Sequence, residues 1–495
     1  MILSRYSYDA MELNDLVKLL QPAMVVGDRA GTLKGVAYDS RLVEKGYLFV
    51  AICGGSLNGL DFIGEALERG AIAVVAETEI QLPKSVTFIQ VKDARRALAQ
   101  IACAFHRDPS MALDVCGITG TNGKTTVSYL VHGLLANQGR SCGLIGTVEN
   151  RIGSRTIPAS RTTPEAPELQ AMLDQMRENQ CCSAVMEVSS HALDQDRVEG
   201  IDFNVVVFTN LTQDHLDYHN DLESYFAVKA QLFLKRRSGI AVINLDDPHG
   251  KRLLEHEDLV IDSISYGMDP KATVRAKDIM LDSLGSTFVI ESPWGISDIR
   301  LPLLGRFNIS NALAAVAAGG AMGLDFARMI DALEQVPAVP GRLERITALR
   351  GQVFVDYAHT HDALENVLRT LREITVGKLY VIFGCGGDRD REKRRRMARV
   401  AEALADFSIV TSDNPRRERP MDIIAEICSG FTSDENYRVC TDRECAIAVG
   451  VDLLQDGDVL LVAGKGHENY QEFSDSVIPF DDREVTRNII RQRNR

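Results

Sequence analysis

The chain has 495 residues, of which 45% are hydrophobic and 25% charged, and its 69 acidic residues outnumber its 55 basic ones to give a net charge of −14. A chain of this length needs several separate hydrophobic cores, and its negative charge argues against nucleic acid as the main partner. The amino terminus shows no signal peptide, and the longest uncharged stretch, residues 307–324, is too weakly apolar to span a membrane, so we expect a cytoplasmic protein.

Three α/β blocks follow one another along the chain, and we predict one domain for each. The first, residues 1–93, has an amphipathic helix at 62–69 and strands at 47–52 and 71–76. The central block, residues 94–340, ends in a Pro-Gly hinge and has strands at 113–116, 184–188, 205–209 and 240–244. The third, residues 341–495, has strands at 353–356, 379–383, 407–411 and 459–463. Strands that alternate with helices indicate parallel sheets, which bind ligands at the carboxyl ends of their strands.

A glycine-rich segment in the central block predicts a phosphate-binding loop. It lies between the strand at 113–116 and a helix at 127–135 and runs Gly117, Ile118, Thr119, Gly120, Thr121, Asn122, Gly123, Lys124, Thr125, Thr126. Such a loop aims backbone N–H groups at phosphate oxygens, with Lys124 at the outer phosphates and the Thr125 hydroxyl toward Mg²⁺. The usual pattern has Gly where Ile118 stands. The alternative interpretation is an ordinary strand-to-helix turn.

Carboxylate and imidazole side chains follow the next two predicted strands. Glu187 ends the strand at 184–188, and Asp214 and His215 follow the strand at 205–209. If both strands flank the phosphate-loop strand, these side chains reach the nucleotide, where oxygen ligands suit Mg²⁺ and an imidazole completes a second metal site. Lys229 lies farther on, at the start of a helix, and taken alone it indicates only a solvated surface lysine.

Glycines and charged residues collect at four strand ends of the third block, which favours a polar cleft over a core. Arg389 and Arg416 are each suited to hold a carboxylate in a bidentate fork, and Asp413 and Glu468 are suited to hold an ammonium. This combination fits a zwitterionic amino acid. The alternative is a set of solvated loop charges, which is our interpretation of residues 394–396.

Together these motifs resemble those of the Mur ligases of peptidoglycan synthesis over nearly the whole chain, in residues 120–126, 187–193, 210–219, 307–311, 340–344 and 356–363. The resemblance implies an α/β fold of three domains: a smaller N-terminal UDP-binding domain at 1–93, a central ATP-binding domain with a mostly parallel phosphate-loop sheet at 94–340, and a Rossmann-like amino-acid-binding domain at 341–495. It implies small-molecule substrates, and we expect a monomer.

The resemblance also implies roles for individual residues near the nucleotide. ATP is expected at Gly120, Thr121, Asn122, Gly123, Lys124, Thr125, Thr126, Asn308, Asn311, Arg342 and Asp356. Magnesium is expected at Thr125, Glu187, His215 and Lys229, and the last three form the catalytic set with Lys124. Lys229 is implied to carry a carbamate, which makes it an anionic ligand and replaces the surface interpretation.

Two further sets of residues are implied to bind the other substrates. The UDP-linked muramoyl dipeptide is expected at Tyr38, Ser40, Gly55, Ser56, Leu57, Arg161, Thr162, Thr163, Ser189, Gln195 and Arg197. The amino acid is expected at Arg389, Asp413, Asn414, Pro415, Arg416, Gly464 and Glu468. The run from Asp413 to Arg416 resembles the branch of the family that adds meso-2,6-diaminopimelate, in which the Arg receives the distal carboxylate. Departures from the family pattern occur at Asn58, Leu60, Arg161 and His361.

The activity implied is an ATP-dependent ligation that proceeds through an acyl phosphate and releases ADP and phosphate. The alternatives are a relative with another acceptor, such as a lysine-adding ligase or a folylpolyglutamate synthase, and a nucleotide-binding protein without catalysis. Arg416 argues against lysine because it would be left unpaired. The uridine-loop motif argues against folate, and the retained catalytic set argues against a non-catalytic protein.

Overall fold

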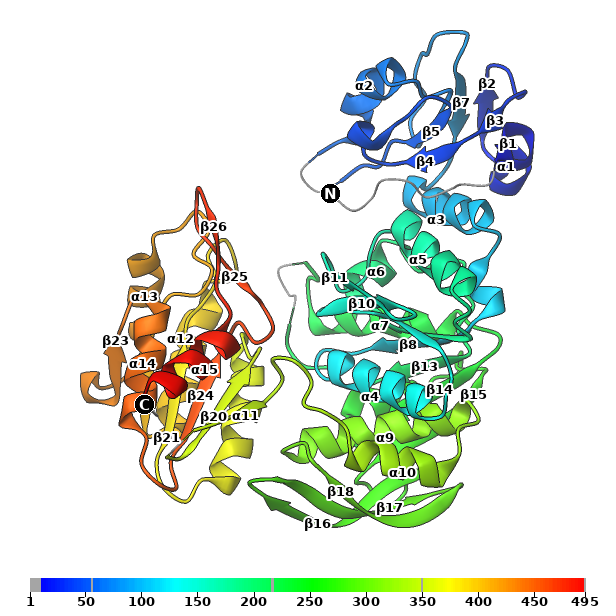
Figure 1. Cartoon of the computed structure of the whole chain (residues 1–495). Helices are drawn as coiled ribbons and strands as arrows, with labels where there is room; N and C mark the ends of the chain where they lie inside the picture. Colours follow the sequence, from blue (N-terminus) through cyan, green and yellow to red (C-terminus); the bar gives the residue numbers. More distant parts are fainter. Residues whose placement is uncertain (1–9, 55–56, 215–217, 349, 494–495) are drawn as a thin grey trace.

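The computed structural model describes residues 10–54, 57–214, 218–348 and 350–493. The predicted site residues Gly55, Ser56 and His215 lie outside these ranges. Figure 1 shows three α/β domains, with the N-terminal domain at the top, the central domain below it and the C-terminal domain to the left. The expected fold class is therefore confirmed. Within the described ranges, every helix is too short or too polar to cross a membrane.

The N-terminal domain is built on a sheet of five strands in the order β2-β7-β6-β5-β4, in which only β2 runs antiparallel to its neighbour. Its strands are β2 (Met24–Val26), β4 (Gly35–Ala37), β5 (Tyr47–Val50), β6 (Ala73–Ala76) and β7 (Thr87–Gln90), with helices α1 (Leu13–Leu20) and α2 (Ile63–Glu68). A second small sheet pairs β1 (Met11–Glu12) with β3 (Thr32–Leu33). The two strands and the helix predicted here are present.

The central sheet has eleven strands in the order β11-β10-β9-β12-β8-β13-β14-β15-β16-β17-β18. β8 (Asp114–Thr119) leads into the predicted phosphate loop and pairs in parallel with β12 (Ser183–Glu187) on one side and β13 (Val205–Phe208) on the other. The two predicted strands therefore flank the phosphate-loop strand, which was the condition for Glu187 to reach the nucleotide. The neighbouring strands are β9 (Cys142–Ile145), β10 (Glu149–Ile152), β11 (Arg155–Pro158), β14 (Ile240–Asn244) and β15 (Asp262–Gly267).

Helices cover both faces of this sheet and enclose two cores. Cys116 and Ile118 of β8 face the first core, while Val115 faces the second, as the period-two alternation of a strand requires. α4 (Lys124–Asn137) and α9 (Arg306–Ala321) contribute to the first core, and α5 (Ala166–Glu178) and α7 (Leu222–Leu234) to the second. The other helices are α3 (Ala94–Phe105), α6 (Ser190–Asp194), α8 (Pro248–Leu254) and α10 (Phe326–Glu334).

An antiparallel ribbon extends the central sheet and was not predicted from the sequence. It consists of β16 (Val274–Asp282), β17 (Gly285–Ser292) and β18 (Gly295–Leu301), at the bottom of Figure 1. In β17, Phe288 and Ile290 are buried while the residues beside them are partly exposed. This alternation is typical of a half-buried antiparallel strand, whereas the predicted parallel strands are buried along nearly their whole length.

The C-terminal sheet has the order β19-β20-β24-β21-β22-β23, and only β19 (Glu344–Thr347) runs antiparallel. All four predicted strands are found: β20 (Gln352–Asp356), β21 (Leu379–Phe383), β22 (Phe407–Val410) and β24 (Val459–Ala463). The fifth parallel strand is β23 (Tyr437–Val439), and a hairpin pairs β25 (Tyr470–Glu472) with β26 (Val477–Pro479). The helices are α11 (His361–Ile374), α12 (Glu392–Leu404), α13 (Pro420–Cys428), α14 (Arg443–Leu453) and α15 (Asp482–Arg493).

The interpretation of residues 394–396 as solvated loop charges is wrong. These residues belong to α12, and the side chain of Arg394 is fully buried. It pairs with Glu418 at 2.8 Å and with Glu426 at 2.8 Å. Arg394 therefore ties α12 to α13 and to the segment before it.

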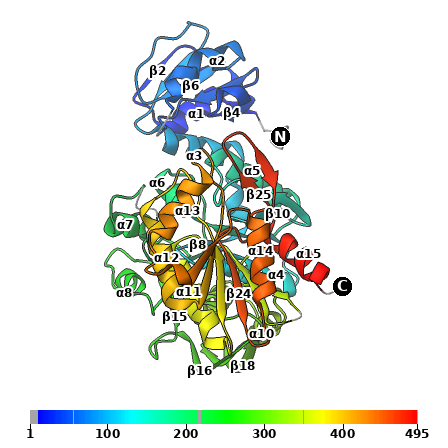
Figure 2. The same ribbon diagram turned by 90° about the vertical axis from the view of Figure 1, so that its left-hand side faces the viewer.

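The C-terminal domain lies beside the central domain. Its helix α11 and the segment after the hinge therefore meet the phosphate loop. In Figure 2, α11 and β24 lie in front of the central domain, and α11 contacts β16. The N-terminal domain is joined to the central domain through α3, which packs against α5. The cavity described below lies where the central and C-terminal domains face each other.

Candidate active site

Two glycines shape the loop that follows β8. Gly120 and Gly123 have φ angles of 145° and 87°, in the range that favours glycine. A Cβ on Gly120 would lie 1.9 Å from Thr209 Oγ1, and one on Gly123 would lie 2.5 Å from Asn311 Oδ1. Glycine therefore lets the loop pass close to the end of β13 and to α9, and α4 begins directly after it at Lys124.

Two lysines meet at one backbone oxygen of this loop. Nζ of Lys124 and Nζ of Lys229 donate to the carbonyl oxygen of Gly120 at 2.9 and 2.8 Å. Burial lowers the pKa of both amines, and the charge of Lys124 adds to the effect on Lys229, whose pKa falls well below its usual value. The surface interpretation of Lys229 is wrong, because this side chain of α7 is buried beneath the loop.

Glu187 ends β12 with a fully buried carboxylate. Its oxygens accept hydrogen bonds from Thr125 Oγ1 at 3.1 Å, from the backbone N–H of Thr147 at 2.8 Å and from Thr147 Oγ1 at 2.9 Å. Thr125 and Glu187 thus present adjacent oxygen donors of the kind that Mg²⁺ prefers, and these residues fit a magnesium site. Among the described residues, no three His, Cys, Asp or Glu side chains form a metal-binding cluster.

Residues expected near the nucleotide lie on both sides of the domain boundary. Asn308 and Asn311 of α9 are joined by a hydrogen bond of 3.0 Å beside Gly123. Nη2 of Arg342, after the hinge, donates to Thr125 Oγ1 at 3.2 Å. Asp356 accepts hydrogen bonds from the backbone N–H groups of Leu343 at 2.7 Å and Ala358 at 2.8 Å, and burial raises the pKa of its carboxyl.

Asp362, in the first turn of α11, connects the C-terminal domain to the phosphate loop. Its Oδ2 atom accepts hydrogen bonds from Asn122 Nδ2 at 3.1 Å and from Thr212 Oγ1 at 2.9 Å. One carboxylate of the C-terminal domain thereby contacts two loops of the central domain, those that follow β8 and β13.

The residues expected to bind the muramoyl dipeptide form a connected group in the central domain. Thr163 Oγ1 donates to the backbone oxygen of Glu187 at 2.8 Å, and Arg197 donates to the backbone oxygen of Thr163 at 2.9 Å. Thr162 Oγ1 lies 3.0 Å from Thr147 Oγ1. The other three expected residues are held by hydrogen bonds as well. Ser189 bonds to Thr163, Gln195 bonds to Arg197, and Arg161 bonds to Glu165, which was not one of the expected residues.

The expected uridine-side residues lie apart from this group, in the N-terminal domain. Tyr38 Oη donates to Glu168 Oε1 of α5 at 2.9 Å, and Ser40 Oγ donates to Glu65 Oε2 at 2.7 Å. Leu57 is 66% exposed. The first of these contacts joins the N-terminal domain to the central one.

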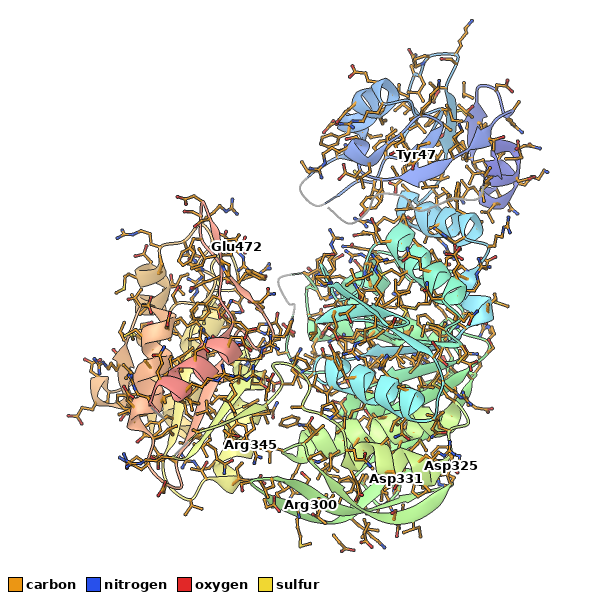
Figure 3. The ribbon with its side chains drawn as sticks, viewed as in Figure 1. Tyr47, Arg300, Asp325, Asp331, Arg345 and Glu472 are labelled. Atoms are coloured by element: carbon orange, nitrogen blue, oxygen red, sulfur yellow. The ribbon has the colours of Figure 1, made fainter. Side chains whose placement is uncertain are left out.

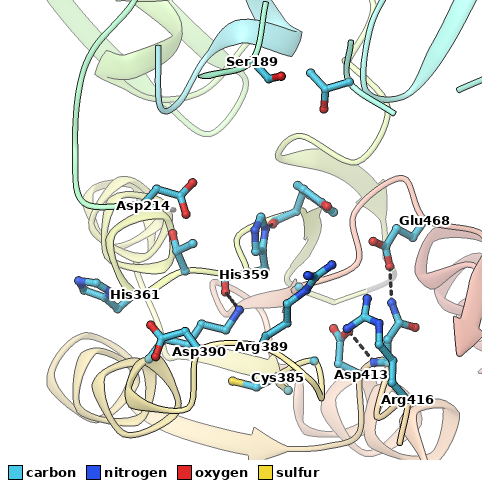
Figure 4. A pocket seen from close by; sticks show the side chains of 18 of the residues that line it. Ser189, Asp214, His359, His361, Cys385, Arg389, Asp390, Asp413, Arg416 and Glu468 are labelled. Carbon is cyan, nitrogen blue, oxygen red and sulfur yellow. Dashed lines mark hydrogen bonds between the residues drawn. The ribbon is translucent and has the colours of Figure 1, made fainter. Parts of the chain in front are cut away.

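A cavity of about 620 Å³ opens between the central and C-terminal domains. Figure 4 shows Ser189 at one wall and Arg389, Arg416 and Glu468 at the opposite wall. Of the residues expected to bind the dipeptide and the amino acid, it is lined by Arg161, Thr162, Thr163, Ser189, Arg197, Arg389, Asp413, Asn414, Arg416, Gly464 and Glu468, but not by Gln195 or Pro415. None of the described residues expected at ATP, at magnesium or at the uridine lines it. The cavity thus brings the expected dipeptide and amino-acid residues to one space.

A network of charged and amide groups forms the C-terminal wall. Asn414 Nδ2 donates to Glu468 Oε2 at 2.9 Å, and Nζ of Lys465 donates to Asn414 Oδ1 and to Glu468 Oε2, each at 3.0 Å. Burial by itself would raise the pKa of Asp413, but Lys465 and Arg443 outweigh it and hold that pKa below its usual range. A Cβ on Gly464 would lie 2.8 Å from Asp413 Oδ2, so glycine allows this close packing.

Three family models match this chain in succession. The model described as "Mur ligase family, catalytic domain" matches residues 32–106, "Mur ligase middle domain" matches 118–319, and "Mur ligase, glutamate ligase domain" matches 341–466. The UDP-N-acetylmuramoyl-L-alanyl-D-glutamate–2,6-diaminopimelate ligase of Geobacter sulfurreducens is 44% identical over 498 residues, which cover 96% of this chain and 97% of that one. The chain belongs to the Mur ligase family.

Two further comparisons support this assignment. The ligase of the same name from Geobacter metallireducens is 45% identical over 500 residues, which cover 96% of this chain and 97% of the relative. A solved structure of such a ligase is 34% identical and covers 98% of this Mur ligase and 100% of its own chain, with a TM-score of 0.71.

Several residues that hold this Mur ligase site together were not singled out from the sequence. Thr147 bonds twice to Glu187, Lys465 bonds to Glu468, and Glu472 pairs with Arg416 at 2.9 Å. Arg443 is fully buried and pairs with Asp482 at 2.7 Å. The signal available for Lys465 was its position in the Gly-rich strand end, whereas Thr147 and Glu472 lie in segments without any motif.

Proposed function

We propose that this Mur ligase joins meso-2,6-diaminopimelate to UDP-N-acetylmuramoyl-L-alanyl-D-glutamate at the expense of ATP. The observation that carries the proposal is its identity of 44% and 45% to ligases of that name over almost the full length of both chains. The arrangement of Asp413, Asn414 and Arg416 around the cavity supports the choice of amino acid.

The reaction requires two displacements in one enclosed space. An oxygen of the D-glutamyl side-chain carboxylate attacks the γ-phosphorus of ATP, the bond to the β-phosphate oxygen breaks, and ADP leaves. The amine of diaminopimelate then attacks the acyl carbon, the bond to phosphate breaks, and the nitrogen loses a proton. Catalysis of such steps is mostly positioning and charge stabilisation.

The residues around the phosphate loop supply that positioning. The loop directs backbone N–H groups and Lys124 toward the phosphates, and Asn308, Asn311, Arg342 and Asp356 surround the rest of the nucleotide. Thr125, Glu187 and His215 would hold Mg²⁺, which supplies positive charge to the transferring phosphoryl group when bound. Closure of the C-terminal domain excludes water, which would otherwise hydrolyse the acyl phosphate.

We further propose that Lys229 is carbamylated. A neutral amine adds to CO₂ to give a carbamate and a proton, and the low pKa of Lys229 favours the neutral form. The product is an anion beside Lys124, so carbamylation gives the Lys124 amine a buried partner of opposite charge that the neutral Lys229 amine does not provide. With ¹³C-labelled bicarbonate, a carbamate resonance should appear in the wild type and be lost in Lys229→Arg. The same resonance in both proteins would contradict the proposal.

Three organisational features belong to the same proposal. We propose domains at residues 1–93, 94–340 and 341–495, because the three sheets fall into these ranges. We propose a monomer, and light scattering after gel filtration measures this directly. Use of ATP and of a nucleotide-linked precursor supports action in the cytoplasm.

The proposed function is tested by phosphate release from ATP in the presence of the UDP-linked dipeptide. We expect release with meso-diaminopimelate, and a kcat/KM at least about a hundredfold lower with L-lysine, which lacks the second carboxylate that would bind the end of the Arg416 guanidinium not held by Glu472. Lys124→Ala serves as the inactive control. Equal rates with the two amino acids would refute the choice of amino acid, and no release with either would refute the ligase.

A further inference from the structure

Arg416 is held on two of its three nitrogens by neighbouring residues. Nε donates to Glu472 Oε2 at 2.9 Å, and Nη1 donates to the backbone oxygen of Gly387 at 2.9 Å. Among the residues that the structure describes, none accepts a hydrogen bond from Nη2. The end of the guanidinium formed by Nη1 and Nη2 therefore remains available to a ligand in the cavity, which Arg416 lines.

Glu472 holds the loop that carries Arg416 with its backbone as well as its carboxylate. The backbone N–H of Glu472 donates to Asn414 Oδ1 at 3.0 Å, and its carbonyl oxygen accepts from the backbone N–H of Arg416 at 3.0 Å. Arg416 has a φ of 50°, an unusual value for a residue with a side chain, so this backbone contact stabilises a strained conformation. Figure 3 shows Glu472 at the upper part of the C-terminal domain, where β25 ends.

We propose that Glu472 is a positioning residue that selects for diaminopimelate by orienting Arg416. The proposal rests on the proposed function. The carboxylate of Glu472 accepts the hydrogen bond from Nε of Arg416 and thereby fixes the orientation of the guanidinium. Its other end, formed by Nη1 and Nη2, then faces the cavity, where it can bind the second carboxylate of diaminopimelate. Glu472 does not line the cavity and acts only through Arg416.

Two opposing effects of Glu472 decide whether its removal raises or lowers KM for meso-diaminopimelate. Glu472 carries a negative charge that weakens the attraction of Arg416 for another carboxylate, and it also removes the rotational freedom of the guanidinium. The pair is partly exposed, with 22% and 38% of the two side chains accessible, so the charge effect is screened by solvent. A hydrogen-bond acceptor, rather than a charge, is therefore what the site needs at position 472.

The test compares Glu472→Ala with Glu472→Gln, which keeps an oxygen acceptor for Nε without the charge. We expect Glu472→Ala to raise KM for meso-diaminopimelate about fivefold to tenfold with kcat retained, the order expected for losing one hydrogen bond in a partly exposed pair. Glu472→Gln should restore KM to within about threefold of the wild type. For L-lysine, which has no second carboxylate, kcat/KM should be the same in all three proteins.

A matched control is Asp452→Ala, which removes the partner of Arg493 from an exposed pair of 2.7 Å elsewhere in the C-terminal domain. This variant should change neither the KM for meso-diaminopimelate nor the KM for L-lysine. An unchanged or lower KM in Glu472→Ala would overturn the proposal, as would an equal loss for both amino acids, which indicates damage to the loop. These results differ from failure of the proposed function, in which the wild type itself does not use meso-diaminopimelate.

Discussion

Thr147 connects the expected metal ligand to the expected dipeptide site. Its hydroxyl oxygen lies 2.9 Å from Glu187 Oε2 and 3.0 Å from Thr162 Oγ1, and its backbone N–H donates to the other oxygen of Glu187. Since the carboxylate is fully buried, its orientation depends on these neutral donors. A change at Thr147 should therefore affect magnesium use as well as stability.

Thr147→Val tests this connection because valine keeps the shape and the backbone bond but removes the hydroxyl. We expect the magnesium concentration for half-maximal activity to rise about tenfold and the free energy of unfolding to fall by about 1–2 kcal/mol. Mn²⁺ binding followed by electron paramagnetic resonance gives the affinity without turnover. Thr147→Ser should retain wild-type values, and unchanged Mn²⁺ affinity in Thr147→Val would contradict the role.

Two partly buried imidazoles make the stability of this protein sensitive to acid. Burial lowers the pKa of His359, and it lowers that of His467 to about 3. Because the unfolded pKa is about 6.5, the stabilisation is complete above that pH and is lost as the pH falls from there toward 3. Within this pH range, each such histidine lowers the free energy of unfolding by up to about 1.4 kcal/mol for each unit by which the pH falls.

Urea unfolding at pH 6.5 and pH 5.5 measures this loss. We expect His467→Gln to lose about 1 kcal/mol less than the wild type over that interval, because glutamine takes up no proton. The comparison between the two proteins removes the contribution of carboxylates, which they share. An equal loss in both would show that His467 does not titrate with unfolding.

At the scale of elements, one buried charge adds to the apolar packing between α12 and α13. Arg394 donates to Glu418 Oε1 at 2.8 Å and to Glu426 Oε2 at 2.8 Å, and Glu418 also accepts from the backbone N–H of Asp388 at 2.7 Å. The arginine pairs hold the pKa of Glu418 at about 2. The loop that carries Arg389 is thus fixed from behind by this group.

Arg394→Ala should lower the free energy of unfolding by about 3 kcal/mol, because it removes the buried partner of Glu418 and Glu426 and leaves them only the exposed Arg391. Arg395→Ala is a matched control, since the next side chain on the same helix is exposed. Thermal unfolding at neutral pH measures both. A similar change in melting temperature for the two variants would show that burial of Arg394 contributes nothing.

The elements near the site were predictable to the extent that local patterns mark them. Apolar runs located β8, β12, β13 and four of the five parallel strands of the C-terminal sheet, and polar residues at their ends located Glu187 and Asp413. Burial of Lys229 and Arg394 was not predictable, because a basic residue on a helix has the same local pattern whether a neighbouring loop covers it or not. The ribbon β16 to β18 is half-buried, so polar residues interrupt its apolar pattern and weaken the signal.

At the scale of the whole molecule, the central and C-terminal domains meet through polar contacts at the phosphate loop and through Leu304 and Phe307, which pack against the core of the C-terminal domain. At the loop, Asp362 bonds to Asn122 and Thr212, and Arg342 bonds to Thr125. Because the polar contacts at the loop contribute only a few kcal/mol, the position of the C-terminal domain relative to the phosphate loop is expected to respond to nucleotide binding. Asp362 is the residue whose removal should reveal this most directly.

Asp362→Ala should weaken the association of the two domains and leave each domain folded. We expect a larger radius of gyration in small-angle X-ray scattering without nucleotide, and a KM for ATP raised about threefold to tenfold, since the binding energy of ATP must then also bring the domains together. Glu365→Ala is the control, because Glu365 lies on the same helix and pairs only with Arg369 among the described residues. If scattering and KM for ATP are the same in both variants, Asp362 does not couple the domains, and the arrangement depends on the hinge and on Arg342.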